Sequence, residues 1–380
     1  MIMWLFIRNI QIERKNIMEK NEILMIYGKN YKEMTKEILT SAKLAEQIGD
    51  KKKKIGLKPN LVVAKTPDSG ATTHMEMIEG TIEYLQENGF KNISITEGSW
   101  VGDRTQAAFR VCGYPEVARK YGVKLVDNQQ DTYKSYNAKG MQLNVCDFPM
   151  SLDFLINMPV LKGHCQTTIT CALKNNKGLI PNSEKRKFHT MGLHKPIAHL
   201  ATVVPNDFIL VDNICGDLDF EEGGNPVTMN RIMAFRDPVL CDAFVCETMG
   251  YPVSEVAYIG MAEKLGVGCA DTSKAKIIEL NEGCNAKGKI RMTRRVQELA
   301  KYVEPVDACS ACYGSLIYAL DRLNDMGMLR NCKKKIAIGQ GYKGQTGEIG
   351  IGHCTCGFEK SCKGCPPKAI DMVEFLKKEL

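Results

Sequence analysis

The 380-residue sequence lacks any long apolar run and is poor in aromatic side chains. No window approaches the roughly 18 consecutive apolar residues that a membrane-spanning helix needs. Aromatic residues make up 7% of the chain, and the 51 basic and 44 acidic side chains leave a net charge of only +7. Basic stripes interleaved with aromatics, which are typical of nucleic-acid binders, are missing. The sequence therefore predicts no membrane and no nucleic acid as a partner.

The beginning of the chain lacks the features of a secretory signal peptide. No basic segment precedes the apolar residues Met1 to Ile7, and no small-residue cleavage site follows them. We therefore expect a cytoplasmic protein whose thiols stay reduced unless they bind metal. The strand pattern becomes regular only after Met18, so residues 1–21 are interpreted as an N-terminal extension. Nothing in the sequence indicates an oligomeric state.

Short apolar runs alternate with helical patterns through most of the chain. Strands are predicted at 23–27, 55–63, 92–96, 123–127, 152–158, 208–212 and 276–280, and helices at 30–48, 75–87, 104–121, 238–249 and 254–265. Apolar strands separated by helices are typical of parallel βαβ units whose sheet is covered on both faces. The pattern predicts an α/β fold with a mainly parallel sheet over residues 22–303, followed by a small cysteine-rich module over 304–380.

Cysteine is the residue type that the sequence has in excess. Sixteen are present, and seven of them follow residue 308. They include two C-x-x-C pairs and one C-x-C: Cys309/Cys312, Cys362/Cys365 and Cys354/Cys356. These are more thiolates than one four-coordinate metal needs. The C-terminal module is therefore predicted to hold a metal centre.

Zinc and an iron–sulfur cluster are both compatible with this pattern. A Cys₄ zinc site would use the two C-x-x-C pairs. The segment Gly364-Cys365-Pro366-Pro367 instead resembles the Gly-Cys-Pro-Pro segment in the small subunits of nickel–iron hydrogenases and of respiratory complex I. That resemblance implies one [4Fe–4S] cluster on Cys309, Cys312, Cys354 and Cys365, with Cys356 and Cys362 as competing ligands. Cys332 receives no role.

A basic segment at residues 162–199 holds seven basic side chains, one acid and four of the six histidines. Lys162 and His164 follow a predicted buried strand, and the carboxyl ends of parallel strands form the ligand crevice of open α/β sheets. We predict that Lys162, Lys174 and Lys177 bind a small anionic substrate and that His164 donates or accepts a proton. Residues 185–187 are expected in a solvated loop.

An acidic segment at residues 207–222 follows, with six acids and no base. It is explained either by charge pairing with the basic segment or by a role at the site, such as holding a hard cation. We predict that Asp212, at the end of the strand 208–212, orients a neighbouring base. Further candidate substrate-binding residues lie at a strand end and at a helix start, with Thr73 as the expected N-cap of that helix: Lys58, Asn60, Thr73 and His74.

Several of these segments are similar to the recurrent motifs of the domain of unknown function 362 family. They are Lys58–Val62, Gly70–His74, Glu97–Trp100, Leu161–His164, Ala172–Gly178 and Gly216–Gly224. The resemblance covers about residues 22–300. It implies the α/β architecture and, because members often carry an iron–sulfur segment, it agrees with the cysteine pattern. It implies no particular reaction.

These patterns together predict an iron–sulfur oxidoreductase or electron-transfer protein that acts on a small anionic metabolite or a redox protein. Two alternatives belong to other classes. One is a non-redox isomerase or lyase for a hydroxy acid, with Lys and His performing acid–base chemistry beside a structural cluster. The other is a binding module whose cluster senses redox state. With zinc in place of iron, the C-terminal module would be structural.

Overall fold

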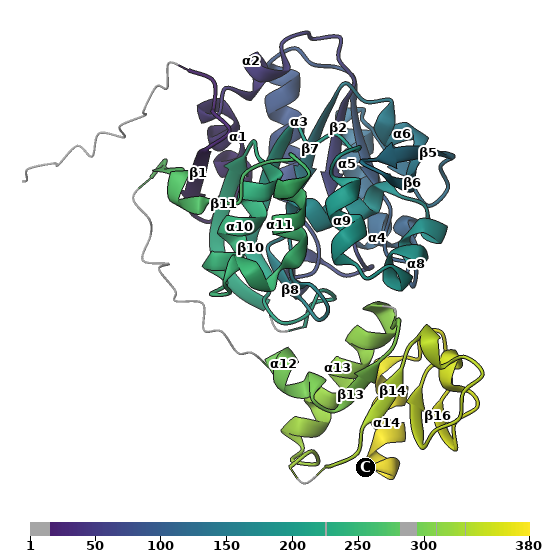
Figure 1. Cartoon of the computed structure of the whole chain (residues 1–380). Coiled ribbons are helices and arrows are strands. Elements are labelled where there is room, and N and C mark those ends of the chain that lie inside the picture. Colours follow the sequence, from purple (N-terminus) through teal and green to yellow (C-terminus); the bar gives the residue numbers. More distant parts are fainter. Residues whose placement is uncertain (1–15, 225, 282–294, 309, 331) are drawn as a thin grey trace, which may run out of the picture.

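The computed structural model describes residues 16–224, 226–281, 295–308, 310–330 and 332–380. These residues form a large α/β unit and a smaller C-terminal unit, which lie one beside the other in Figure 1. Within these ranges, no helix combines the length and the apolar character that crossing a membrane requires.

An eight-stranded sheet forms the centre of the large unit. Its order is β12 (Lys276–Glu279), β1 (Glu22–Tyr27), β11 (Pro226–Phe235), β10 (Phe208–Asp217), β7 (Phe154–Met158), β2 (Ile55–Pro59), β3 (Ile93–Glu97) and β4 (Lys124–Asp127). Five of its seven neighbouring pairs are parallel, and β11 is antiparallel to both of its neighbours. The predicted mainly parallel α/β sheet is confirmed.

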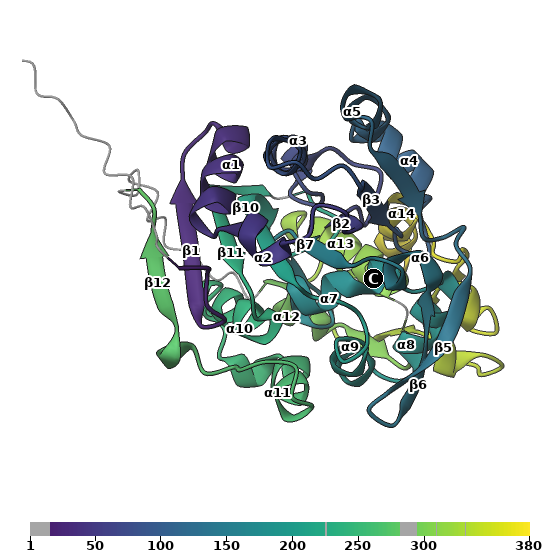
Figure 2. The same ribbon diagram turned by 90° about the horizontal axis from the view of Figure 1, so that it is seen from above.

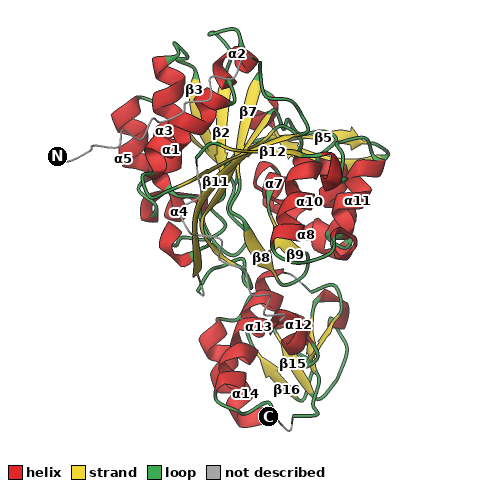
Figure 3. Ribbon diagram, turned by 90° about the vertical axis from the view of Figure 1, so that its left-hand side faces the viewer, coloured by secondary structure: helices red, strands yellow, loops and turns green. Residues whose placement is uncertain are grey.

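Helices cover both faces of this sheet (Figures 2 and 3). One face carries α1 (Tyr31–Ser41), α2 (Leu44–Ile48), α3 (Met75–Glu87), α4 (Thr105–Val111) and α5 (Tyr114–Tyr121). The other carries α7 (Ala172–Asn175), α8 (Asn182–Thr190), α9 (His194–Leu200), α10 (Pro238–Thr248) and α11 (Ala257–Lys264). Each face of the sheet packs against its helices in a separate hydrophobic core. Successive strand residues point to opposite faces, so Leu210 packs into the first core and Val211 into the second.

Some predicted elements are shorter than expected because the backbone breaks them. The predicted helix 30–48 is interrupted at Lys43, which adopts a left-handed conformation with φ of 53°. The predicted helix 104–121 is interrupted at Gly113, whose φ is 78°. The predicted strand 55–63 ends at Pro59. In contrast, β10 is longer than the predicted strand 208–212 and continues to Asp217.

The elements that were not predicted include β11 and a hairpin of β5 (Tyr133–Ala138) with β6 (Met141–Cys146). The short helix α6 (Asp147–Met150) follows this hairpin. The hairpin buries Leu143 and Val145 in the second core, whereas most of β5 is exposed. Polar strands of this kind lack the apolar run from which the other strands were inferred.

The C-terminal unit has its own sheet and core. Its four parallel strands are β13 (Val303–Pro305), β14 (Ile336–Ile338), β15 (Ile349–Ile351) and β16 (Lys360–Cys362), and its helices are α12 (Arg295–Ala300), α13 (Ser310–Asp325) and α14 (Ala369–Glu379). Leu316 and Leu320 of α13 pack on the apolar strand residues. The core of this unit therefore includes residues from α12 onward.

Phe220 joins the two units. It follows β10 in the large unit, yet it is 4% exposed and packs into the core of the C-terminal unit. Its ring stands edge-on to Tyr318 of α13, with centroids 6.0 Å apart. Close by, Gln166 Nε2 donates a hydrogen bond to the Ala308 carbonyl oxygen at 2.9 Å. The loop after β10 thus fixes the C-terminal unit on the large one.

We predict that Phe220→Ala destabilises the protein by about 3 kcal/mol or more, because the substitution leaves a cavity in the C-terminal core. Urea denaturation followed by circular dichroism measures the change. The half-buried Phe148 of α6 provides the control. An equal loss of stability in Phe148→Ala would show that Phe220 has no special role between the units.

Candidate functional site

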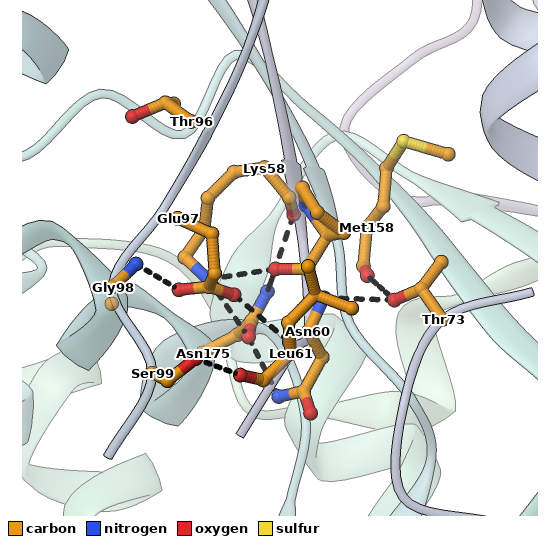
Figure 4. A network of polar contacts seen from close by, with 12 residues as sticks. Lys58, Asn60, Leu61, Thr73, Thr96, Glu97, Gly98, Ser99, Met158 and Asn175 are labelled. Atoms are coloured by element: carbon orange, nitrogen blue, oxygen red, sulfur yellow. Dashed lines mark hydrogen bonds and ion pairs between the residues drawn. The ribbon is translucent and has the colours of Figure 1, made fainter. Parts of the chain in front are cut away.

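A buried ion pair lies at the carboxyl ends of β2 and β3 (Figure 4). Lys58 Nζ lies 2.7 Å from Glu97 Oε2 and also donates to the Pro59 carbonyl and to Asn175 Oδ1. Asn60 Nδ2 donates to the same Asn175 oxygen at 2.8 Å. Burial lowers the pKa of Lys58, while Glu97 acts in the opposite direction. The pair is fixed by neighbours from three elements.

Lys162 is held beside this pair. It begins β8 (Lys162–His164), which pairs with β9 (Thr168–Thr170). Its Nζ donates to Asn60 Oδ1 at 2.9 Å and to the carbonyl oxygens of Ala71 at 2.6 Å and Glu221 at 2.8 Å. Burial lowers the pKa of Lys162 to about 7. The side chain is fully buried and its position is fixed by three acceptors.

Glu221 connects the other predicted residues. Its Oε2 lies 2.8 Å from His164 Nε2 and 2.7 Å from Lys174 Nζ. His164 Nδ1 accepts hydrogen bonds from the backbone N–H groups of Gln166 and Thr167, both at 3.0 Å. The proton of the neutral ring therefore lies on Nε2, which is close to Glu221 but makes no hydrogen bond of normal geometry within the described chain.

The charges in this group follow from burial and from the short contacts. Burial lowers the pKa of His164 to about 4, which keeps the ring neutral near pH 7. Burial opposes ionisation of Glu221, but His164 and Lys174 hold the pKa of its carboxyl well below the usual range. Sequence reasoning allowed charge pairing between the acidic and basic segments, but it did not single out Glu221.

Lys58, Glu97, Lys162, Lys174 and Glu221 line one small pocket of about 80 Å³. His164 is not part of this lining and borders a neighbouring cavity, whereas His189 lines the pocket. The charged lining of the pocket consists of five lysines and two glutamates: Lys58, Lys162, Lys174, Lys177, Lys185, Glu97 and Glu221. Gly178 lies against the ion pair, because a Cβ atom there would collide with the Glu97 carboxylate and approach Lys58 Nζ to 2.7 Å. The excess of cationic groups favours an anionic ligand.

Lys185 corrects a prediction. Residues 185–187 were expected in a solvated loop, but they lie in α8, and Lys185 is only 4% exposed. Its Nζ donates to the carbonyl oxygens of Gly98 at 2.9 Å and Ser99 at 2.8 Å, and burial lowers its pKa to about 8. Arg186 and Lys187 are exposed, as expected for solvated side chains. Because these residues lie on a helix, Lys185 points into the protein while its two basic neighbours point to solvent.

His74 and Asp212 form a separate pair that does not line the pocket in the part of the chain described. Asp212 Oδ2 accepts hydrogen bonds from the His74 backbone N–H at 2.7 Å and contacts His74 Nδ1 at 2.8 Å. Burial opposes protonation of His74, but Asp212 raises its pKa overall. The histidine beside Asp212 is thus His74, whereas His164 lies beside Glu221.

The expected N-cap of α3 was Thr73, and this is wrong. His74 occupies the N-cap position and makes no capping hydrogen bond through its side chain. The Thr73 hydroxyl instead donates to the Met158 carbonyl and accepts from the Asn60 backbone N–H, both at 2.8 Å. Thr73 therefore ties β7 to the turn that carries Asn60 (Figure 4).

Three of the four predicted cysteine ligands lie on segments that meet at Gly352. A Cβ atom added to Gly352 would lie 3.3 Å from Cys312 Sγ and 3.6 Å from the Gly364 carbonyl oxygen. Gly352 stands two residues before Cys354, and Gly364 directly precedes Cys365. The fourth predicted ligand, Cys309, lies outside the described residues.

The described cysteines of this unit are not arranged around a single ion. Across the described ranges, three metal-ligating atoms come within 4.8 Å of one another only at Cys171, Cys241 and Asp242 of the large unit. The ligands of an iron–sulfur cluster bind different iron atoms and lie further apart than the ligands of one ion.

The match to a family model lies within the large unit. The family model of the domain of unknown function DUF362 matches residues 55–247. This range contains every residue that lines the lysine pocket and none of the C-terminal cysteines. The thylakoid-associated protein sll1697 of Synechocystis sp. (strain ATCC 27184 / PCC 6803 / Kazusa) is 22% identical over 222 residues, which are 56% of this chain and 67% of that protein.

One solved structure is also similar, the lactate racemase apoprotein from Thermoanaerobacterium thermosaccharolyticum. The TM-score is 0.40 and the sequence identity is 14%. The match covers 61% of this chain and 57% of the other, so it spans little more than half of that structure.

The pKa of Lys162 predicts a pH dependence of stability. The unfolded side chain has a pKa of 10.5 and the folded one a pKa of about 7, so the unfolded state binds more protons between these values. Lys162 therefore makes the free energy of unfolding rise from pH 7 to about pH 10, by up to about 1.4 kcal/mol per pH unit. Lys162→Met is expected to remove this part of the slope.

Urea denaturation at pH 7, 8 and 9 tests this expectation. Lys162→Met also leaves three acceptors without a donor, so the readout is the slope with pH and not the absolute stability. Lys187→Met, at an exposed position of α8, is the control and should keep the wild-type slope. Parallel slopes for wild type and Lys162→Met would show that the folded ammonium stays protonated over this range.

Proposed function

The chain belongs to the DUF362 family of domains of unknown function, and we propose that it is an iron–sulfur oxidoreductase or electron-transfer protein acting on a small anionic substrate. The contact between the lysine pocket and the cysteine-rich unit carries this proposal. Glu221 lines the pocket, and the adjacent Phe220 is buried in the core of that unit. One short loop would thus contact both the bound substrate and the unit that carries the redox group.

The pocket supports a small anion as the ligand. Lys174, Lys177 and the protonated form of Lys162 offer positive charge, and Glu221 offsets only part of it. One water-sized group needs about 10–15 Å³ of cavity, so a pocket of about 80 Å³ admits roughly six such groups. This size favours a short carboxylate or a phosphate and disfavours a nucleotide.

The C-terminal unit supports a [4Fe–4S] cluster as the redox group. Cys312, Cys354 and Cys365 would hold it together with Cys309, and the absence of a side chain at Gly352 lets the segments of Cys312 and Cys365 approach that of Cys354 closely. When bound, such a cluster supplies or accepts single electrons. The side-chain Nε2 of Gln166, two residues after His164, donates a hydrogen bond to the carbonyl oxygen of Ala308. Ala308 directly precedes Cys309 in the sequence.

The residues around the pocket would bind the substrate and manage its protons. Lys174 and Lys162 neutralise the anion, and Glu221 keeps Lys174 and His164 in place. Because His164 Nδ1 is occupied by two N–H groups, a proton that His164 passes on must leave from Nε2. Asp212 orients His74, which lies outside the pocket lining.

A non-redox isomerase or lyase is the second candidate, and Lys162 favours it. A lysine whose pKa is near 7 can exchange protons at neutral pH, as general bases of such enzymes do. The oxidoreductase needs an electron donor or acceptor for turnover, whereas the isomerase or lyase does not. Turnover that is independent of dithionite in a protein with a redox-inert cluster would support the second.

We predict that Cys365→Ser loses most of the iron and sulfide of the protein, because one of four thiolate ligands is removed. Anaerobic purification, iron and sulfide analysis, and EPR after reduction with dithionite provide the measurement. Cys332→Ser is the control, since Cys332 is not a predicted ligand and its thiol faces the Lys334 carbonyl. Unchanged iron in Cys365→Ser, or a colourless wild-type protein with zinc on these cysteines, would contradict the proposal.

The lysine pocket gives a second prediction. Millimolar phosphate or lactate should raise the melting temperature of the wild-type protein, because an anion that binds only the folded state stabilises it. Lys174→Met should abolish most of this shift, whereas Lys187→Met should keep it. The anion prediction does not involve the cluster: His164→Gln should also retain iron and sulfide, because His164 is not one of the predicted cysteine ligands. An equal shift in wild type and Lys174→Met would exclude this pocket as the anion site.

A further inference from the structure

Two cysteines and an aspartate meet in the apolar core of the large unit. Cys171 directly precedes α7, and Cys241 and Asp242 lie on α10. All three side chains are fully buried. The two Sγ atoms are 3.7 Å apart, and a carboxylate oxygen of Asp242 lies within 4.8 Å of both. Nothing in the proposed redox function uses these groups.

Asp242 has polar neighbours but, among the residues that the structure describes, no cationic one: its carboxyl group interacts with the Tyr258 hydroxyl and with the backbone N–H groups of Ala172 and Leu173. It accepts two long hydrogen bonds from the Leu173 backbone N–H, at 3.3 and 3.4 Å. No basic side chain in the described ranges forms an ion pair with it. Buried carboxylates in proteins are normally paired with a cation or bound to a metal. The core therefore contains an acid for which the protein supplies no counter-charge.

Tyr258 borders the same cluster and interacts with the Asp242 carboxyl group. Its hydroxyl lies beside Asp242 and Cys171 and is fully buried. It makes no hydrogen bond of normal geometry within the described chain. A buried hydroxyl without such a bond is uncommon and often marks a bound water or ion. Here it borders the same three potential ligands.

The spacing of the sulfur atoms fits one tetrahedral zinc ion. Two thiolates bound at about 2.3 Å with a tetrahedral angle between them place their sulfur atoms about 3.8 Å apart. The observed distance is 3.7 Å. Thiolates select zinc over hard cations, and a carboxylate is a common third ligand. The N–H groups of Ala172 and Leu173 face the cluster and offset part of its negative charge.

We propose that Cys171, Cys241 and Asp242 bind one zinc-like divalent cation in a structural site that is separate from the C-terminal cysteines. Because the three ligands are fully buried, the ion would be incorporated as the chain folds. It would join α10 to the start of α7, the helix that carries Lys174 and Asn175. The site would thereby support the floor of the lysine pocket.

Metal analysis of the full-length protein tests this site. Wild type, Cys241→Ser, Cys246→Ser and Cys365→Ser are expressed with added zinc and purified anaerobically, and zinc per chain is measured by mass spectrometry. Cys246 is the matched control, because it is a buried cysteine of the same helix whose thiol faces the carbonyl oxygens of Tyr251 and Pro252. About one zinc per chain is expected in wild type, Cys246→Ser and Cys365→Ser, and at least fivefold less in Cys241→Ser.

Two results would overturn the proposal: no zinc in the wild type, or zinc that is lost in Cys365→Ser and kept in Cys241→Ser. If Cys241→Ser does not fold, cobalt replaces zinc in the Cys365→Ser protein. The expected spectrum then has thiolate-to-cobalt charge-transfer bands and the visible bands of a tetrahedral ion. Cobalt without these bands also overturns the proposal. Because the cluster is assayed by iron and sulfide, the two centres are tested independently.

Discussion

The buried carboxylate of Glu221 is the group on which the arrangement of the site depends. One of its oxygens contacts both His164 and Lys174, and the carbonyl of the same residue accepts a hydrogen bond from Lys162. A buried charge costs free energy unless such contacts compensate for it. Because the preceding Phe220 is fixed in the C-terminal core, the position of this carboxylate depends on the docking of the two units.

The buried lysines of the pocket are stable in the absence of ligand because the protein supplies their acceptors. Lys58, Lys162 and Lys185 each donate to backbone carbonyls at the ends of strands or in the turns that follow them. Such fixed side chains need little reorganisation when an anion binds, which lowers the entropic cost of binding. The parallel strand order brings these residues together, since their carboxyl ends meet at one edge of the sheet.

The fold could largely be predicted, because buried parallel strands are mostly apolar runs such as 154–158 and 208–211. Strand β11 escaped prediction because its first half is polar and exposed, and only its pairing with β1 and β10 orders it. Lys58 and Lys162 were singled out from their positions at strand ends, whereas Lys185 was expected in a solvated loop. Glu221 was not singled out, because its partners lie 47 and 57 residues earlier and local spacing carries no information on such contacts.

Gly178 makes part of this geometry recognisable in other chains. Any side chain at this position would push into the space that the Lys58–Glu97 pair occupies. A family member with a larger residue there must therefore have lost or rebuilt that ion pair, whatever its remaining motifs. This single position could sort the relatives into those that retain the same cationic cavity and those that have adapted the scaffold to a different ligand.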